Sequence, residues 1–328
     1  MHNKLLSGKA PGLALVIAIA VPAMFLGHLF PLLGGAVIAM LLGLGCRSVY
    51  QPGAALQPGL QFASKQVLQY SIVGLGFSLP IHEVVRTGLT SLPVSLITLA
   101  VAFAVALAVG KLLHIPEKLK ILIGAGTAIC GGSAIAAITP VLRPDDHDTA
   151  YALSTIFLFN IVAVMIFPAL GRHFGMSDTG FGLWAGTAIN DTSSVVAAAY
   201  AWNNFAGEYA TIVKLTRAMM IVPVTLVLGL LFSRGRGAAA VPLHKNVPWF
   251  IVLFVLASVV NEWLPPALTA AIRQLAPFMI VLALAGIGLG TDVQRLRRAG
   301  WKPLLLGLVV WCSVAVSSLL VQHLTGMI

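Results

Sequence analysis

Long apolar segments separated by short polar connections constrain the fold of this chain more than any other feature. Of its 328 residues, 59% are hydrophobic and only 9% are charged. Soluble domains contain about 25% charged residues, so this composition excludes an ordinary water-soluble globule. A helix needs about 20 apolar residues to cross the hydrocarbon core of a bilayer. We therefore predict an all-α polytopic membrane protein that contacts the lipid bilayer.

Gly, Pro and charged residues divide the sequence into about eleven predicted transmembrane helices. They cover residues 12–29, 31–46, 64–80, 91–112, 119–141, 150–171, 181–201, 210–232, 247–264, 274–291 and 302–322. The connections leave no room for a soluble domain, so residues 1–328 are treated as a single integral membrane transporter domain. The third span is the weakest, because Lys65, Gln66 and Gln69 make it amphipathic. It either lines a cavity or lies partly at the membrane interface.

Basic residues are unevenly shared between the two sets of loops. One side holds Arg47, Lys111, Lys118, Lys120, Arg172, Arg234, Arg236, Lys245, Arg295, Arg297, Arg298 and Lys302; the other holds Arg86, Arg143 and Arg273. By the positive-inside rule this bias predicts a cytoplasmic N-terminus and a periplasmic C-terminus. The net charge of +10 comes from these dispersed residues, so no nucleic-acid partner is predicted.

No constellation of residues predicts an enzyme or a metal site. Cys46, Cys130 and Cys312 lie in or beside apolar segments, which argues against disulfides and zinc. The charged loop 145–148 has no metal-ligand spacing and is interpreted as a solvated turn. No cofactor is expected beyond coupling to Na⁺ or H⁺.

Two internal echoes indicate a repeat of the kind from which transporters are often built. Residues 124–133 and 184–193 share Ala-Gly-Thr-Ala-Ile, and residues 74–88 share glycines and an arginine with 286–300. If there are eleven spans, the two helices of the second pair cross the membrane in opposite directions, as an inverted repeat requires. The first pair has the same orientation, so either the match is chance or one segment is re-entrant.

The segment from Cys130 through Gly131 and Gly132 to Ser133 is a candidate break within an apolar span. Each glycine lowers helix propensity by about 1 kcal/mol relative to alanine. A break would free N–H groups at the start of the following half-helix, where an anion is favoured. Thr127 and Ser133 would add hydroxyl ligands. The alternative is close packing through small residues.

The most polar stretch inside any predicted span comprises Asn190, Asp191, Thr192 and Ser193, followed by Ser194. A charge at the centre of a membrane costs at least about 2.5 kcal/mol, so such residues are usually functional. Asp191 and its neighbours are candidate ligands for a coupling Na⁺ or proton. The alternative is an aspartate that joins helices by hydrogen bonds.

Lys214 and Arg217 lie three residues apart on one face of the eighth predicted span. The functional hypothesis pairs one of them with Asp191 and directs the other to an anionic substrate, for which the planar arginine fork is suited. The alternative is that both side chains extend to the membrane interface.

Residues 126–137, 186–198 and 213–220 together resemble the YeiH-type bacterial inner-membrane family, catalogued as conserved hypothetical proteins or sulfate exporters. The likeness covers nearly the whole chain. Asn190 departs from the family, in which we associate histidine with this position; this weakens a proton-relay role. The resemblance implies kinship with the bile-acid and arsenite transporter superfamily, in which a panel domain faces a core domain with crossed, broken helices. Core-type helices would lie around 119–141 and 181–232.

We therefore predict an inverted-repeat secondary transporter in the bacterial inner membrane, an exporter of a small anion, with sulfate or a sulfonate first. Glycines 74, 76, 286 and 288 would allow close packing at the moving boundary. A Na⁺/H⁺ or Na⁺-coupled carrier that uses Asp191 is the alternative. A further alternative, from another class of protein, is a non-transporting membrane sensor or assembly partner. The sequence also allows the protein to form homo-oligomers.

Overall fold

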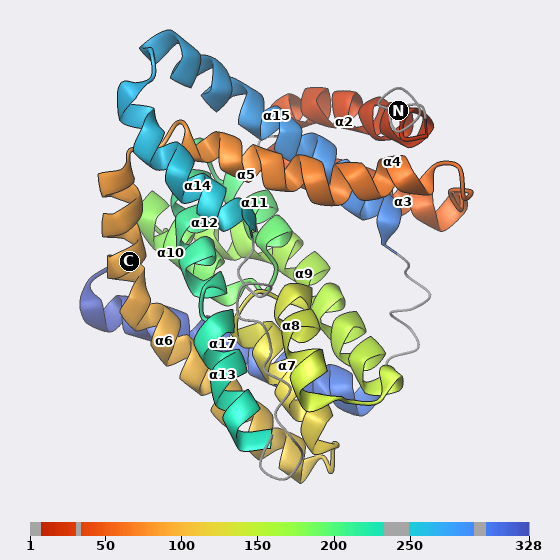
Figure 1. Cartoon of the computed structure of the whole chain (residues 1–328), viewed down its shortest axis with the longest axis vertical. Coiled ribbons are helices and arrows are strands. Elements are labelled where there is room, and N and C mark those ends of the chain that lie inside the picture. Colours follow the sequence, from red (N-terminus) through yellow and green to blue (C-terminus); the bar gives the residue numbers. More distant parts are fainter. Residues whose placement is uncertain (1–7, 31–33, 233–248, 292–299, 328) are drawn as a thin grey trace.

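The structure, a computed structural model, describes residues 8–30, 34–232, 249–291 and 300–327 (Figure 1). Within these ranges the regular secondary structure is entirely helical, which confirms the predicted all-α fold. The helices that are long and apolar enough to cross a membrane are Ala10–Leu29, Ile81–Leu112, His147–His173, Asn204–Phe232, Pro266–Gly290 and Trp301–Thr325. Shorter apolar helices accompany them. Six of the basic residues on which the predicted charge bias rests lie outside the described residues: Arg234, Arg236, Lys245, Arg295, Arg297 and Arg298.

The helices form two groups, which we call the flanking bundle and the hairpin bundle. The flanking bundle consists of α2 (Ala10–Leu29), α3 (Gly34–Val49), α4 (Gln57–Gln61), the π-helix η1 (Phe62–Val67), α5 (Leu68–Gly76), α14 (Trp249–Val260), η3 (Asn261–Trp263) and α15 (Pro266–Gly290). Helix α15 packs along α2, α3 and α5 in the upper part of Figure 1. Helices α4, η1 and α5 follow one another without a break.

The hairpin bundle lies below the flanking bundle in Figure 1. It consists of α6 (Ile81–Leu112), α7 (Glu117–Ala128), α8 (Gly132–Leu142), α9 (Asp146–His173), α10 (Asp178–Ala188), α11 (Thr192–Tyr200), α12 (Asn204–Ala218), α13 (Ile221–Phe232) and α17 (Trp301–Thr325). Helices α6 and α17 pack against each other and against α7.

Helices α7 and α8 form a hairpin instead of one spanning helix. Lys118, in the first turn of α7, donates a hydrogen bond of 2.7 Å to the carbonyl of Arg143, which follows α8 and lies 25 residues later. A continuous helix would separate these residues by about 37 Å. The chain turns back at Gly131, whose φ of 69° and ψ of −131° suit only glycine. The break is where the sequence predicts it, but the predicted span 119–141 is wrong.

Helices α10 and α11 form a second hairpin. Trp202 donates a hydrogen bond of 2.7 Å to Asp178 at the start of α10, and its ring stacks on Phe181 with centroids 4.3 Å apart. Arg172, at the end of α9, donates to the carbonyl of Ala201 at 3.0 Å. The predicted span 181–201 therefore also turns back. Arg143 and Arg172 consequently lie on the opposite sides from those that eleven spans assign them.

The two hairpins enter from opposite ends of the molecule. Their open ends are joined by α9, which has 28 residues and a length of about 42 Å. Helices α7 and α10 contain 12 and 11 residues, which give depths of about 18 and 16 Å. Together these depths match a hydrocarbon core of about 30 Å. Each hairpin thus reaches roughly the middle of the membrane.

This path explains the shared Ala-Gly-Thr-Ala-Ile sequence. Each copy lies at the end of the first hairpin helix, and each hairpin is followed by a long helix: α9, or α12 with α13. A hairpin returns to the side it came from and the long helix crosses once, so consecutive units are inverted. The re-entrant alternative is correct for both copies, which form an inverted repeat.

We expect residues 118 and 143 to be labelled from one side of the membrane, and residues 178 and 202 from the other. The reason is that each pair joins the two ends of one hairpin. Single cysteines at these positions, in a variant without the three native cysteines, can be tested with an impermeant maleimide on oriented vesicles. Labelling of 118 and 143 from opposite sides would contradict the hairpin.

The four glycines expected at a moving boundary pack within the flanking bundle. A Cβ on Gly76 would meet Phe254 and Ala257 of α14, and one on Gly288 would meet Met40 of α3. Gly286 faces η1, and Gly74 faces α15. The predicted close packing is confirmed, but the contacts lie inside the flanking bundle and not where it meets the hairpin bundle. These residues instead let helices of one bundle approach closely.

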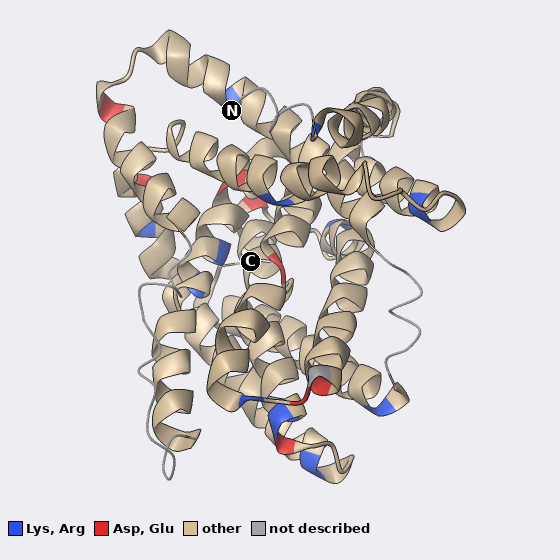
Figure 2. Cartoon of the chain, turned by 45° about the vertical axis from the view of Figure 1, so that its right-hand side comes forward, with Lys and Arg blue, Asp and Glu red and all other residues tan. Residues whose placement is uncertain are grey.

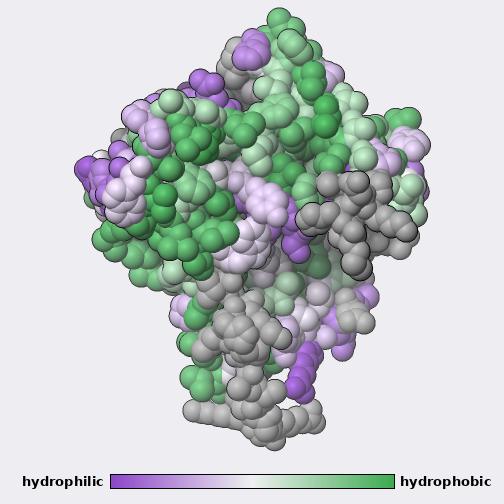
Figure 3. Space-filling model, turned by 45° about the horizontal axis from the view of Figure 1, so that its top comes forward, coloured by the Kyte–Doolittle hydropathy of each residue, from purple (hydrophilic) through white to green (hydrophobic). Residues whose placement is uncertain are grey.

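The outer surface is suited to lipid. Large apolar side chains such as Leu112, Leu230 and Leu324 are at least 70% exposed. Figure 3 shows broad hydrophobic areas, and Figure 2 shows most charged residues near the ends of helices with a few in the middle. Isolated exposed leucines are normal, but contiguous areas of this size indicate an apolar environment.

Candidate functional site

The tips of the two hairpins meet at one point. A Cβ placed on Gly131 would lie 3.3 Å from the Cβ of Asp191. These residues occupy equivalent positions in the two copies of the repeat. Helices α7 and α10 end here, and α8 and α11 begin here. The site therefore combines two negative and two positive helix ends.

Lys214 and Arg217 of α12 hold the ends of α7 and α10 together. Lys214 donates hydrogen bonds to the equivalent carbonyls of Ile129, at 2.8 Å, and Ile189, at 2.9 Å. Arg217 donates to the carbonyls of Ala128 at 2.5 Å and Thr127 at 2.7 Å, and to that of Thr187. Helix ends leave such carbonyls without partners, and cations are stabilised there.

Both cationic side chains are fully buried, which excludes the alternative that they extend to the interface. Among the described residues, neither forms an ion pair with Asp191, so the hypothesised pairing is not found. Neither lines the cavity described below. Their observed contacts are those of a clamp on the hairpin tips.

Asp191 caps the helix that follows it. Its carboxylate accepts hydrogen bonds from the N–H of Ser193, at 3.0 Å, and from the Ser193 hydroxyl. Its own N–H donates to the side-chain oxygen of Asn160 on α9 at 3.2 Å. An aspartate in this position satisfies one of the free N–H groups of a helix start. Helix α8 has Gly131 at the same position and therefore no side-chain cap.

A cavity of about 1010 Å³ lies between the bundles and reaches the hairpin tips. Its lining comes from α3, η1, α5, α8, α9, α11, α14 and α15. Ser133 and the run from Asp191 to Ser194 form its inner end. His147 and Tyr151, at the start of α9, and Thr291, after α15, lie toward the open end of the α7–α8 hairpin. The cavity is thus on one side of the tips.

The predicted site residues fall into three groups. Ser133, Asp191, Thr192 and Ser193 line the cavity. Thr127, Cys130 and Asn190 are buried at the tips without lining it, as are Lys214 and Arg217. Gly131 and Gly132 form the turn into α8. The sequence thus located both tips but did not determine which residues face the open space.

Four cavity residues were missed or undervalued in the sequence analysis. Lys65 and Gln69 line the cavity, which confirms one of the two interpretations of the amphipathic third span. His147 lines it too, although its loop was interpreted as a solvated turn. Asn160 lies in an apolar helix and gave no signal beyond being the one amide in that span.

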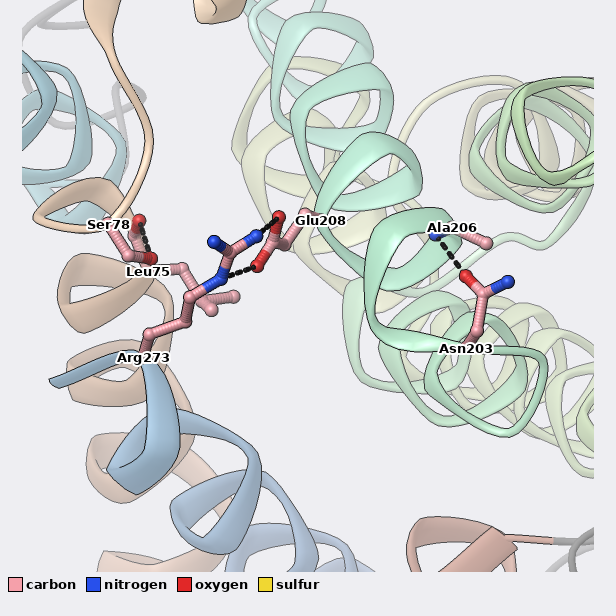
Figure 4. A network of polar contacts seen from close by, with 6 residues as sticks. All are labelled: Leu75, Ser78, Asn203, Ala206, Glu208 and Arg273. Carbon is pink, nitrogen blue, oxygen red and sulfur yellow. Dashed lines mark hydrogen bonds and ion pairs between the residues drawn. The ribbon is translucent and has the colours of Figure 1, made fainter. Parts of the chain in front are cut away.

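An ion pair joins the bundles on the side away from the cavity. Arg273 of α15 donates to both carboxylate oxygens of Glu208 on α12, at 3.0 and 2.9 Å (Figure 4). Glu208 is 7% exposed and Arg273 is 58% exposed. Glu208 lies near the start of α12, which follows the open end of the α10–α11 hairpin.

The protein is an all-α polytopic membrane protein, as its helical architecture, its apolar exterior and its two inverted hairpins show. The family model described as conserved hypothetical protein 698 matches residues 11–307. The UPF0324 membrane protein of Streptococcus agalactiae serotype V is 41% identical over 330 residues, which cover 97% of this chain and 98% of that protein. That of Fusobacterium nucleatum is 39% identical over 349 residues, covering 99% of each. The chain belongs to this family, as the resemblance predicted.

Proposed function

We propose that this protein is a secondary carrier of a small anion, with sulfate or a sulfonate first, that works by alternating access. The observation that carries the proposal is the cavity that ends at two inverted hairpin tips. Transporters commonly bind substrate near the middle of the membrane, at the interface of inverted repeats and beside the starts of broken helices. The start of α8 offers its positive end to an anion there.

Access from one side and closure on the other also support a carrier. In the proposed orientation, with the N-terminus in the cytoplasm, the cavity opens to the cytoplasm. The Glu208–Arg273 pair then closes the periplasmic side, and its release lets the bundles move relative to each other. Lys214 and Arg217 keep the two tips together during this motion. Kinship with bile-acid and arsenite carriers remains a prediction.

Coupling to a cation is the second candidate function. Among the described residues that line the cavity, Asp191 is the only carboxylate. It lies beside Asn190, whose amide atoms are buried and form no hydrogen bond within the described chain. Oxygen ligands of this kind suit Na⁺. Replacing Asp191 by asparagine should abolish transport in a cation exchanger, whereas an anion carrier would retain uncoupled anion flux.

We expect sulfate or a sulfonate to raise the Tm of the detergent-purified protein, because a ligand of the folded state stabilises it by mass action. At 100 times the Kd the gain is about 2.7 kcal/mol. The panel should include chloride, carboxylates, Na⁺ and a pH series. Flux of the stabilising anion into proteoliposomes then tests transport. A response to Na⁺ or pH alone, lost in Asp191→Asn, would favour the cation carrier.

A further inference from the structure

Asn160 has a buried amide group with a free donor at the inner end of the cavity. The side chain is 4% exposed and lines the cavity. Its oxygen accepts the N–H of Asp191 at 3.2 Å, which fixes the orientation of the amide. Its Nδ2 forms no hydrogen bond within the described chain. A buried amide nitrogen without an acceptor is costly, so this position favours a ligand that supplies one.

Asp191 connects Asn160 to the start of α8. Asp191, which bonds Asn160, also packs against Gly131 at the turn into α8. Because Gly131 provides no side-chain cap, the N–H groups of Gly132 and Ser133 at the start of α8 keep their capacity to bind an anion. Ser133 adds a hydroxyl on the cavity surface. These donors belong to α8 and α9.

The wall beside these donors is apolar. A Cβ on Gly132 would lie 3.4 Å from Leu153 and 3.7 Å from Phe157, and both side chains line the cavity. Leu153, Phe157 and Asn160 share one face of α9, because they are four and three residues apart. Sulfate presents oxygens in all directions, and its oxygens against this wall would lack donors.

We infer that Asn160 Nδ2, the start of α8 and Ser133 bind the head of an organic oxyanion, while Leu153 and Phe157 contact a short hydrocarbon group attached to it. The inference rests on the proposed function and narrows its substrate class. A small alkanesulfonate fits this arrangement better than sulfate does. Asn160 is then a specificity-determining residue.

The test measures binding of ethanesulfonate, propionate and sulfate to the full-length protein in detergent. Wild type should bind ethanesulfonate at least about tenfold more tightly than sulfate, since a matched apolar contact contributes 1–3 kcal/mol and 1.4 kcal/mol is tenfold. If propionate binds more tightly than ethanesulfonate, the charged head of the ligand is a carboxylate. Asn160→Asp keeps the oxygen that accepts the N–H of Asp191 but replaces the amide donor by a second oxygen. It should weaken the binding of organic anions at least about tenfold.

Two further variants keep the test decisive. Leu153→Asn should reduce the preference for ethanesulfonate over sulfate even if Asn160→Asp does not fold. Ser64→Ala, in a cavity residue on η1, is the matched control and should leave affinities within about threefold. Equal affinity for sulfate and ethanesulfonate, or unchanged affinity in folded Asn160→Asp, would overturn the inference and leave an anion carrier. Absence of any anion binding or flux in wild type would instead refute the proposed function.

Discussion

Arg217→Met is expected to destabilise the protein by at least about 3 kcal/mol, which is the largest effect of any substitution considered. The guanidinium donates to three buried carbonyls from two hairpins. Methionine fills a similar volume but leaves these carbonyls without donors, at a cost of about 1–3 kcal/mol for each unsatisfied buried group. Thermal unfolding of the purified variant in detergent measures the loss.

Two variants separate this role from substrate binding. Arg217→Lys keeps the charge but loses the planar fork, so it should recover only part of the stability. Arg86→Met removes an exposed arginine from α6 and should change stability by less than about 0.5 kcal/mol. If Arg217→Met were as stable as wild type but failed to bind the anion, the residue would return to the role of a substrate ligand.

Glu208→Gln is expected to open the side of the protein that the ion pair closes. The carboxylate is almost fully buried and accepts a two-pronged hydrogen bond from Arg273, an arrangement stronger than an ordinary surface pair. Its loss should raise accessibility of the cavity from that side about fivefold to tenfold, which corresponds to about 1.0–1.4 kcal/mol. The readout is the labelling rate of a single cysteine replacing Ser133.

The charge-swapped protein is the sharpest control for this prediction. Combining Glu208→Arg with Arg273→Glu should return the labelling rate toward wild type, because the pair is re-formed with reversed polarity. Glu262→Gln, at an exposed carboxylate of η3 in the flanking bundle, should leave the rate unchanged. A Glu208→Gln protein that labels like wild type would show that the ion pair does not hold the bundles together.

Which segments are helical and where they break could be predicted from residues alone. Hydropathy marked the apolar segments, and the glycines at 131 and 132 and the polar run from Asn190 located both breaks. In lipid, a backbone N–H or carbonyl without a hydrogen-bond partner is unfavourable wherever it occurs, so a helix breaks only where nearby residues permit it. A short sequence window therefore carries enough information to find these places.

The direction of the chain after each break was decided by tertiary structure. A hairpin and a spanning helix have the same hydropathy, and only contacts between distant residues, such as Lys118 with Arg143, distinguish them. The partners of Lys214 and Arg217 were hidden for the same reason. The sequence placed both cations on one face of a helix, but the carbonyls opposite them belong to segments 25 to 90 residues away. Sequence thus determined the class, the helices and the breaks, whereas packing decided which buried groups meet and which face the cavity.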